Sequence, residues 1–153
     1  MSFFGSLDTS ASALSAQRLR LDIISQNMAN ANTTRTEQGG AYKKKNVIFE
    51  EITNNSKEKF SNVYNRSKLK NMTNSNNNGV RVKEIVEDRT QGTMIYDPNN
   101  PDANEQGYVE QSNVNIIDEM VDMISASRSF EANVNAFNST KSIFNKALEI
   151  GNK

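Results

Sequence analysis

The longest hydrophobic pattern lies near the C-terminal end of the chain, over residues 116–150. Apolar residues return there in alternating steps of four and three, the spacing of a coiled-coil seam. The seam positions are Ile116, Met120, Met123, Ser127, Phe130, Val134, Phe137, Lys141, Phe144 and Leu148. With Asn115 as its N-cap, the predicted helix is about 50 Å long at about 1.5 Å per residue. A helix of that length needs a second long helix to cover its seam.

A second helical pattern covers residues 6–32. Its apolar positions keep a spacing of three or four, with a break at Gln17 and Arg18. These positions are Leu7, Ala11, Leu14, Leu21, Ile24, Met28 and Ala31. Many of the remaining residues are Ser and Ala, whose small side chains let a neighbouring backbone approach closely. The many Ser and Asn residues also predict poor helix stability in isolation.

The segment between these helices reads as short strands and polar loops. Residues 45–50, 79–86 and 93–96 are rich in β-branched residues with partial alternation, which predicts strands. Residues 56–78 form an Asn-rich, polar stretch that predicts a loop, and residues 97–102 contain two prolines that predict a turn.

The predicted fold class is therefore α+β, mainly α. Long N- and C-terminal helices pack as a coiled-coil-like pair, with a small β region between them. The predicted organisation is an N-terminal helical segment at 1–35, a β-rich or extended middle at 36–112, and a long helix at 113–153.

Composition narrows the function. The chain has 153 residues, 35% of them hydrophobic, no Trp, and 18 basic residues balanced by 18 acidic ones. This suits an elongated or assembly-dependent fold and gives no global attraction to nucleic acid. Without His or Cys there is no catalytic triad, thiolate nucleophile or imidazole or thiolate metal ligand. We therefore expect no enzyme activity and no cofactor or metal. No apolar run reaches the roughly 18 residues of a membrane span, and the N-terminus does not resemble a cleaved signal peptide.

Three polar clusters have ordinary structural interpretations. The Asp and Asn residues at 97–105 fit a calcium loop poorly, because neither alignment supplies both the central Gly and the final Glu, so a plain turn is favoured. Lys43, Lys44 and Lys45 are interpreted as a solvated strand edge rather than a phosphate site. Asp118, Glu119 and Asp122 lie at the start of a predicted helix, where the helix dipole favours carboxylates without any catalytic role.

Asn27, Asn30 and Asn32 allow two interpretations. Asn tolerates left-handed backbone geometry, so these residues could form a polar C-terminal cap of the first helix. A buried amide network that fixes the register between packed helices is equally consistent with the pattern.

Several segments resemble one family. NMANANT at 27–33 resembles the N-terminal signature of flagellar rod and hook proteins, and SNVNIIDEMVDMISASRSFEAN at 112–133 resembles the C-terminal one. The linker YDPNNPDAN at 96–104, followed by GYV at 107–109, and the short length are similar to the proximal rod proteins of the flagellar basal body. The resemblance covers both ends and the linker.

The resemblance implies a structural subunit of the basal-body rod, the tube that transmits motor torque. It implies export through the flagellar type III apparatus without a cleaved signal peptide, and location in the basal body. The implied partners are copies of the chain itself, FlgB, FlgF, FlgG, the adaptor FliE and the export apparatus. The expected assembly interface comprises Leu7, Ala11, Leu14, Leu21, Ile24, Asn27, Met28, Asn30, Asn32, Ile116, Met120, Met123, Phe130, Val134, Phe137, Phe144 and Leu148. The alternatives are a cytoplasmic coiled-coil adaptor or chaperone, and an enzyme using carboxylates or a Ser-Lys pair.

Overall fold

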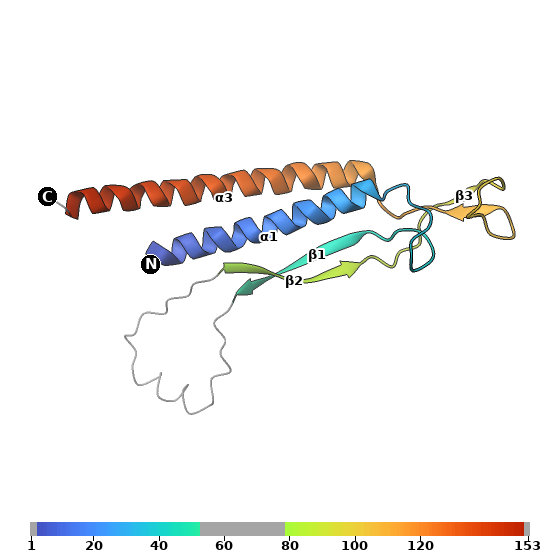
Figure 1. The fold of residues 1–153 in the computed structure, drawn as a ribbon, viewed down its shortest axis with the longest axis horizontal. Coiled ribbons are helices and arrows are strands. Elements are labelled where there is room, and N and C mark those ends of the chain that lie inside the picture. The colour runs from blue at the N-terminus through green and yellow to red at the C-terminus, as the bar shows by residue number, and fades with distance from the viewer. Residues whose placement is uncertain (1–2, 53–78, 152–153) are drawn as a thin grey trace, which may run out of the picture.

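Two long antiparallel helices dominate the fold. The computed structural model describes residues 3–52 and 79–151, with side chains from residue 5 onward. The predicted loop at 56–78 lies outside the described residues. Helix α1 spans Phe3–Ala29 and helix α3 spans Ile116–Gly151, and they lie side by side with both chain ends at the same end of the molecule (Figure 1). This architecture confirms the mainly α, α+β class.

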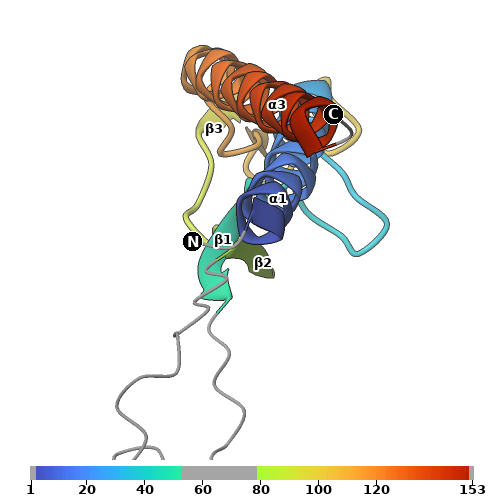
Figure 2. The ribbon, with the colours of Figure 1, turned by 90° about the vertical axis from the view of Figure 1, so that its left-hand side faces the viewer.

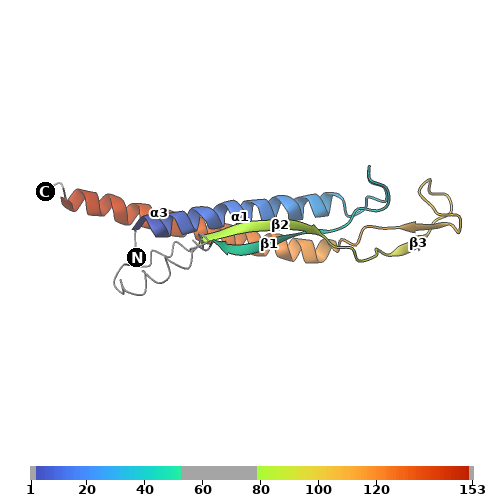
Figure 3. The ribbon, with the colours of Figure 1, turned by 90° about the horizontal axis from the view of Figure 1, so that it is seen from below.

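Two small antiparallel hairpins complete the molecule. Strands β1 (Lys45–Ile52) and β2 (Gly79–Glu87) pair beneath α1, so that α3, α1 and the strands form three layers when viewed end-on (Figure 2). Strands β3 (Met94–Tyr96) and β4 (Tyr108–Glu110) form a second hairpin that projects past the ends of the helices (Figure 3). The sequence analysis did not predict β4, because three residues after a turn carry too little pattern.

Helix α1 is buried on a wider arc than its predicted seam. Ala16, Ile23, Ile24 and Asn27 are buried, whereas Ala11 is exposed. The reason is that α1 contacts α3 on one side and the β1–β2 hairpin on the other, so one stripe cannot describe its contacts. Close approach of the hairpin depends on small side chains: the Val80 amide donates to Ser12 Oγ at 3.2 Å.

In its first turns, helix α3 faces α1 with residues other than those of the predicted seam. Glu119 and Ala126 are the buried residues, whereas Ile116 and Met120 are 43% and 51% exposed. Further along, Met123, Phe130, Val134 and Phe137 are half-buried. Residues 141–151 are exposed throughout, Phe144 and Leu148 included, which matches the longer reach of the 36-residue α3 compared with the 27-residue α1.

The predicted N-cap of α3 is confirmed. Asn115 Oδ1 accepts a hydrogen bond from the Ile117 amide at 3.0 Å, and the Asn115 carbonyl accepts one from the Glu119 amide at 3.0 Å. The cap fixes where α3 begins and therefore which side of its first turn faces α1.

Candidate assembly site at the junction of the terminal helices

The side chain of Asn27 joins α1, β1 and α3. It is 1% exposed. Its Nδ2 donates to Glu119 Oε2 at 3.0 Å and to the Lys45 carbonyl at 2.9 Å. Its Oδ1 accepts from Tyr42 Oη and from the Lys45 amide, both at 3.0 Å. Both donors and both acceptor positions of the amide are therefore used. The register-fixing interpretation is confirmed for Asn27.

The other two asparagines behave differently. Asn30 Nδ2 donates to the Gln26 carbonyl at 2.9 Å, and Asn30 Oδ1 accepts from Thr33 Oγ1 at 3.2 Å. These local bonds satisfy polar groups at the end of α1, so Asn30 acts as a polar cap. The left-handed backbone geometry expected for the cap is absent, because no residue other than glycine in the described part of the chain has a positive φ. Asn32 is exposed.

Glu119 is a buried charge with two partners. It is 1% exposed, and Lys44 Nζ lies 2.6 Å from Oε1 while Asn27 binds Oε2. The interpretation of Glu119 as a carboxylate placed only by the helix dipole is therefore wrong. Because removing one partner would leave an uncompensated buried charge, this group makes the approach of α3 depend on both Asn27 and Lys44.

Of the two other carboxylates at the start of α3, one forms an ion pair with α1 and the other does not. Asp122 pairs with Arg20 of α1 at 3.0 Å, whereas Asp118 is exposed. The link between Asp122 and Arg20 lies one turn beyond Glu119 and fixes the same helix register a second time.

The three consecutive lysines form ion pairs with three different elements. Lys43 pairs with Glu110 of β4 at 2.6 Å, Lys44 with Glu119 of α3, and Lys45 with Glu87 of β2 at 4.0 Å. The interpretation as a solvated strand edge is therefore wrong, because the side chains of all three lysines are half-buried. The run is the point where the β strands and α3 are attached to the end of α1.

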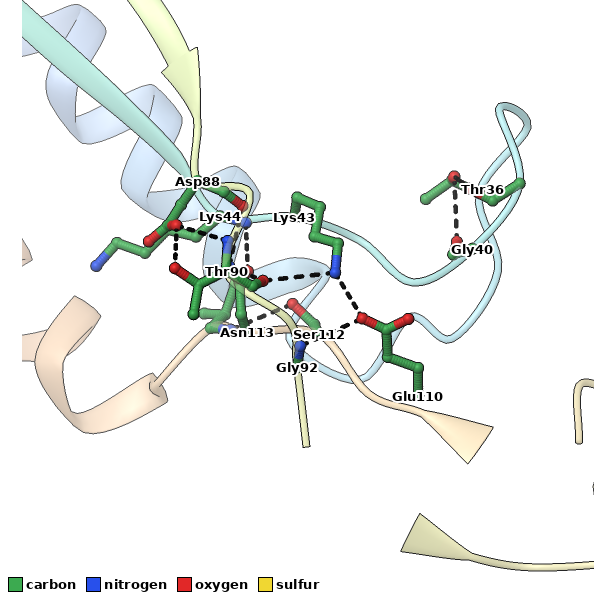
Figure 4. A network of polar contacts seen from close by, with 12 residues as sticks. Thr36, Gly40, Lys43, Lys44, Asp88, Thr90, Gly92, Glu110, Ser112 and Asn113 are labelled. Carbon is green, nitrogen blue, oxygen red and sulfur yellow. Dashed lines mark hydrogen bonds and ion pairs between the residues drawn. The ribbon is translucent and has the colours of Figure 1, made fainter. Parts of the chain in front are cut away.

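Asn113 makes a second set of bonds at the same junction (Figure 4). Its Oδ1 accepts from the Lys44 amide at 2.7 Å, and its Nδ2 donates to the carbonyls of Asp88 and Thr90, both at 3.1 Å. At Gly92 a Cβ would lie 1.7 Å from the Gln111 carbonyl oxygen, so only glycine fits against this segment. Sequence analysis missed Asn113, because nothing in a linker pattern marks which amide bonds to distant segments of the chain.

Contacts around the junction shift the pKa values of three side chains. Hydrogen bonds from Lys43 and from the Gly92 amide lower the pKa of Glu110. The Thr90 hydroxyl and amide lower the pKa of Asp88. Burial, followed by the nearby charges of Glu87 and Glu119, raises the pKa of Tyr42, so its hydroxyl remains a donor to Asn27.

The turn at 97–106 is built from side chain to backbone bonds, as the turn interpretation expects. Asp97, Asn100 and Asn104 each accept from an amide two residues further along the chain. Within residues 3–52 and 79–151, no group of three or more Asp and Glu side chains is arranged to hold a metal ion. No helix in this part of the chain has the length and apolar character to cross a membrane.

The expected interface residues differ in how far the fold buries them. Ile24 and Asn27 are buried within the chain, and Leu7, Leu14, Leu21, Met28, Met123, Phe130, Val134 and Phe137 are half-buried. An exposed stripe on the far side of α3 was missed: Ile117, Val121 and Ile124 are 71%, 62% and 55% exposed. Apolar residues occur on all sides of the helix in this segment, so the pattern could not show which side is free.

The comparisons with known proteins match both ends of the chain. A profile described as "Flagella basal body rod protein" matches residues 7–35, and one described as "Flagellar basal body rod FlgEFG protein C-terminal" matches residues 105–150. The chain is 46% identical to the flagellar basal-body rod protein FlgC of Bacillus subtilis over 99% of each chain. It is 44% identical to FlgC of Borreliella burgdorferi over 98% of each chain, and 32% identical to FlgC of Salmonella typhimurium over 99% of each. The chain therefore belongs to the family of FlgC flagellar basal-body rod proteins.

Proposed function

We propose that this chain is built into the axial rod of the flagellar basal body through α1 and α3. As a FlgC-type protein it is a structural subunit of the rod, located in the basal body. The junction around Asn27 and Glu119 holds the two helices in one register, so that every copy presents the same outer surface. A repeated surface of fixed shape is what a polymer of identical interfaces requires.

The observation that supports assembly through α3 is the stripe of Ile117, Val121 and Ile124. Three large aliphatic side chains lie on one helix face, each more than half exposed. At about 25 cal/mol per Å², covering such side chains contributes roughly 1 kcal/mol or more each. A neighbouring subunit that covers the stripe therefore gains stability at every repeat.

The specific partners follow from the family resemblance. We infer that the neighbours include FlgB, FlgF, FlgG and the adaptor FliE. We also infer that the chain leaves the cell through the flagellar export apparatus without a cleaved signal peptide. The relatives are rod proteins, and we propose that this chain likewise performs no catalysis. No feature of the comparisons supports a cytoplasmic adaptor.

Ile124→Asp tests this function. Ile124 is exposed in the single chain, so the free energy of unfolding should change by less than about 0.5 kcal/mol. In the rod a carboxylate would enter a covered apolar surface, which costs several kcal/mol. We expect the subunit to be secreted but basal-body counts and motility to be lost.

Asn145→Asp is the matched control, because it places the same carboxylate at an exposed position of the same helix. It should leave basal-body counts unchanged. Normal basal-body counts with Ile124→Asp would contradict assembly through this face.

A further inference from the structure

Each terminal helix carries a second face that is exposed in the single chain. On α3 the face follows steps of four and three through Ile117, Val121, Ile124, Arg128, Glu131 and Asn135. On α1 the same spacing runs through Ala11, Ser15, Arg18, Asp22, Ser25 and Ala29. All of these residues are exposed, and steps of four and three are the spacing by which two helices pack side by side.

We propose that this outer face of α3 binds the outer face of α1 in a second copy of the chain, with the two helices antiparallel. The proposal rests on the proposed function and names the partner surface of the same site. The two faces are complementary in size. The first half of the α3 face has branched aliphatic side chains, and the facing end of α1 has Ser25 and Ala29, which leave room for them.

Charge selects the register. When Val121 lies opposite Ala29 in an antiparallel pair, Ile124 lies opposite Ser25. The same register places Arg128 opposite Asp22 and Glu131 opposite Arg18, because both faces advance by the same steps. None of these four charged residues forms an ion pair within the described chain.

Other alignments of the two helix faces lose this pairing of opposite charges. An antiparallel pair displaced by one heptad brings Asp22 against Val121 and Arg18 against Ile124, so both charges lose water against aliphatic side chains. A parallel pair that keeps Arg128 opposite Asp22 also brings Arg18 against Ile124. The antiparallel register with Val121 opposite Ala29 is therefore favoured.

The contact is heterologous, because the surface used on one copy differs from the surface used on the next. After one contact forms, one copy keeps a free α1 face and the other keeps a free α3 face. Such contacts continue from copy to copy and close into a ring or wind into a helical array. This arrangement suits a tubular rod.

A cysteine pair tests the register, because the natural chain contains no Cys. Ala29→Cys and Val121→Cys are introduced together in the full chain, and basal bodies isolated from cells that express it are oxidised. We expect a ladder of covalent dimers, trimers and longer species on a denaturing gel. Each single variant should remain a monomer. So should the control Ala11→Cys with Val121→Cys, because Ala11 shares the face of Ala29 but lies about 27 Å away along α1.

A charge swap gives an independent measurement in case the cysteine variants fail to assemble. Arg128→Asp faces Asp22 with a like charge, and we expect roughly tenfold fewer subunits in isolated basal bodies. Adding Asp22→Arg restores the opposite charges and should return incorporation to near the natural level. Asp22→Arg alone should be as defective as Arg128→Asp.

The outcomes separate this inference from the proposed function. Absence of the natural chain from isolated basal bodies would overturn the proposed function. If the natural chain is present, the inference is overturned by any of four results. These are no ladder from an assembled Ala29/Val121 variant, a cross-linked compact monomer, equal cross-linking of Ala11, or dimers from Val121→Cys alone. Failure of the double charge swap to recover incorporation would overturn it as well.

Discussion

Asn27 of α1 donates a hydrogen bond of 3.0 Å to the buried carboxylate of Glu119 on α3, across the contact between the two terminal helices. The two residues are 92 positions apart in the chain, and each is 1% exposed. Lys44 neutralises the same carboxylate at 2.6 Å. The register of the helix pair therefore depends in part on an amide and a carboxylate that are almost completely removed from water.

Asn27→Ala should destabilise the chain strongly. The change removes the Asn27 amide from Glu119, which keeps only Lys44, and from Tyr42 and the Lys45 backbone. Each buried polar group that loses its partner costs about 1–3 kcal/mol. We expect the free energy of unfolding to fall by about 3 kcal/mol in a urea titration followed by far-UV circular dichroism. Asn30→Ala is the control, since its bonds are local and more exposed, and it should cost less than about 1 kcal/mol. Equal losses would show that the buried network contributes nothing specific.

The junction should weaken in acid. Glu110 has a lowered pKa in the folded chain, so its contribution to stability is present above the ordinary Glu pKa of about 4.3. It is lost as the pH falls through the lower folded value, because the unfolded chain then binds the proton more readily. The urea concentration at the unfolding midpoint of the natural chain should fall as the pH is lowered from about 5 to about 3. Glu110→Gln should reduce that fall, and parallel curves for the two proteins would contradict the role of Lys43 and Glu110.

Order should be uneven along the helices of the isolated monomer. Residues 141–151 are exposed on all sides, whereas the junction holds Asn27 and Glu119. Helical turns that bury little surface are marginal in water. Hydrogen exchange on dilute monomer should be fast over residues 141–151 and near the start of α1, and slowest over residues 20–31 and 116–130. Uniform strong protection along both helices would contradict this expectation.

Phe137→Asp should weaken the pairing of α1 and α3. Phe137 lies three turns after buried Ala126 on the same face of α3 and is itself half-buried. Loss of the ring and burial of a carboxylate should lower the free energy of unfolding by about 2 kcal/mol or more. Ala136→Asp, one exposed position earlier, should cost less than about 0.7 kcal/mol. Similar losses in both variants would place Phe137 outside the helix contact.

The sequence predicted the elements with strong periodicity. Both terminal helices, the cap at Asn115 and the strands at 45–50 and 79–86 lie where the patterns predict them. The orientation of the first turns of α3 could not be predicted, because Ile116, Ile117, Met120, Val121 and Ile124 leave no side of the helix clearly polar. Burial of Glu119 decides which of these face outward.

The partners of the side chains in the junction could not be predicted from the sequence either. Lys43, Lys44 and Lys45 look alike in a pattern, yet each pairs with a carboxylate from a different element. Such pairings depend on contacts between segments far apart in the chain, which periodicity does not encode. For Asn27, the sequence narrowed the role to a cap or a register-fixing amide, and the tertiary contacts decided between them.

The central claim is that this chain is a rod subunit whose terminal helices form the contacts between subunits. A residue-level cryo-electron microscopy map of the intact basal body tests it most directly. We predict α1 and α3 of this chain in the axial rod, with Ile117, Val121 and Ile124 covered by a helix of a neighbouring subunit. A rod without this chain, or a map in which those three side chains still face solvent, would contradict the claim.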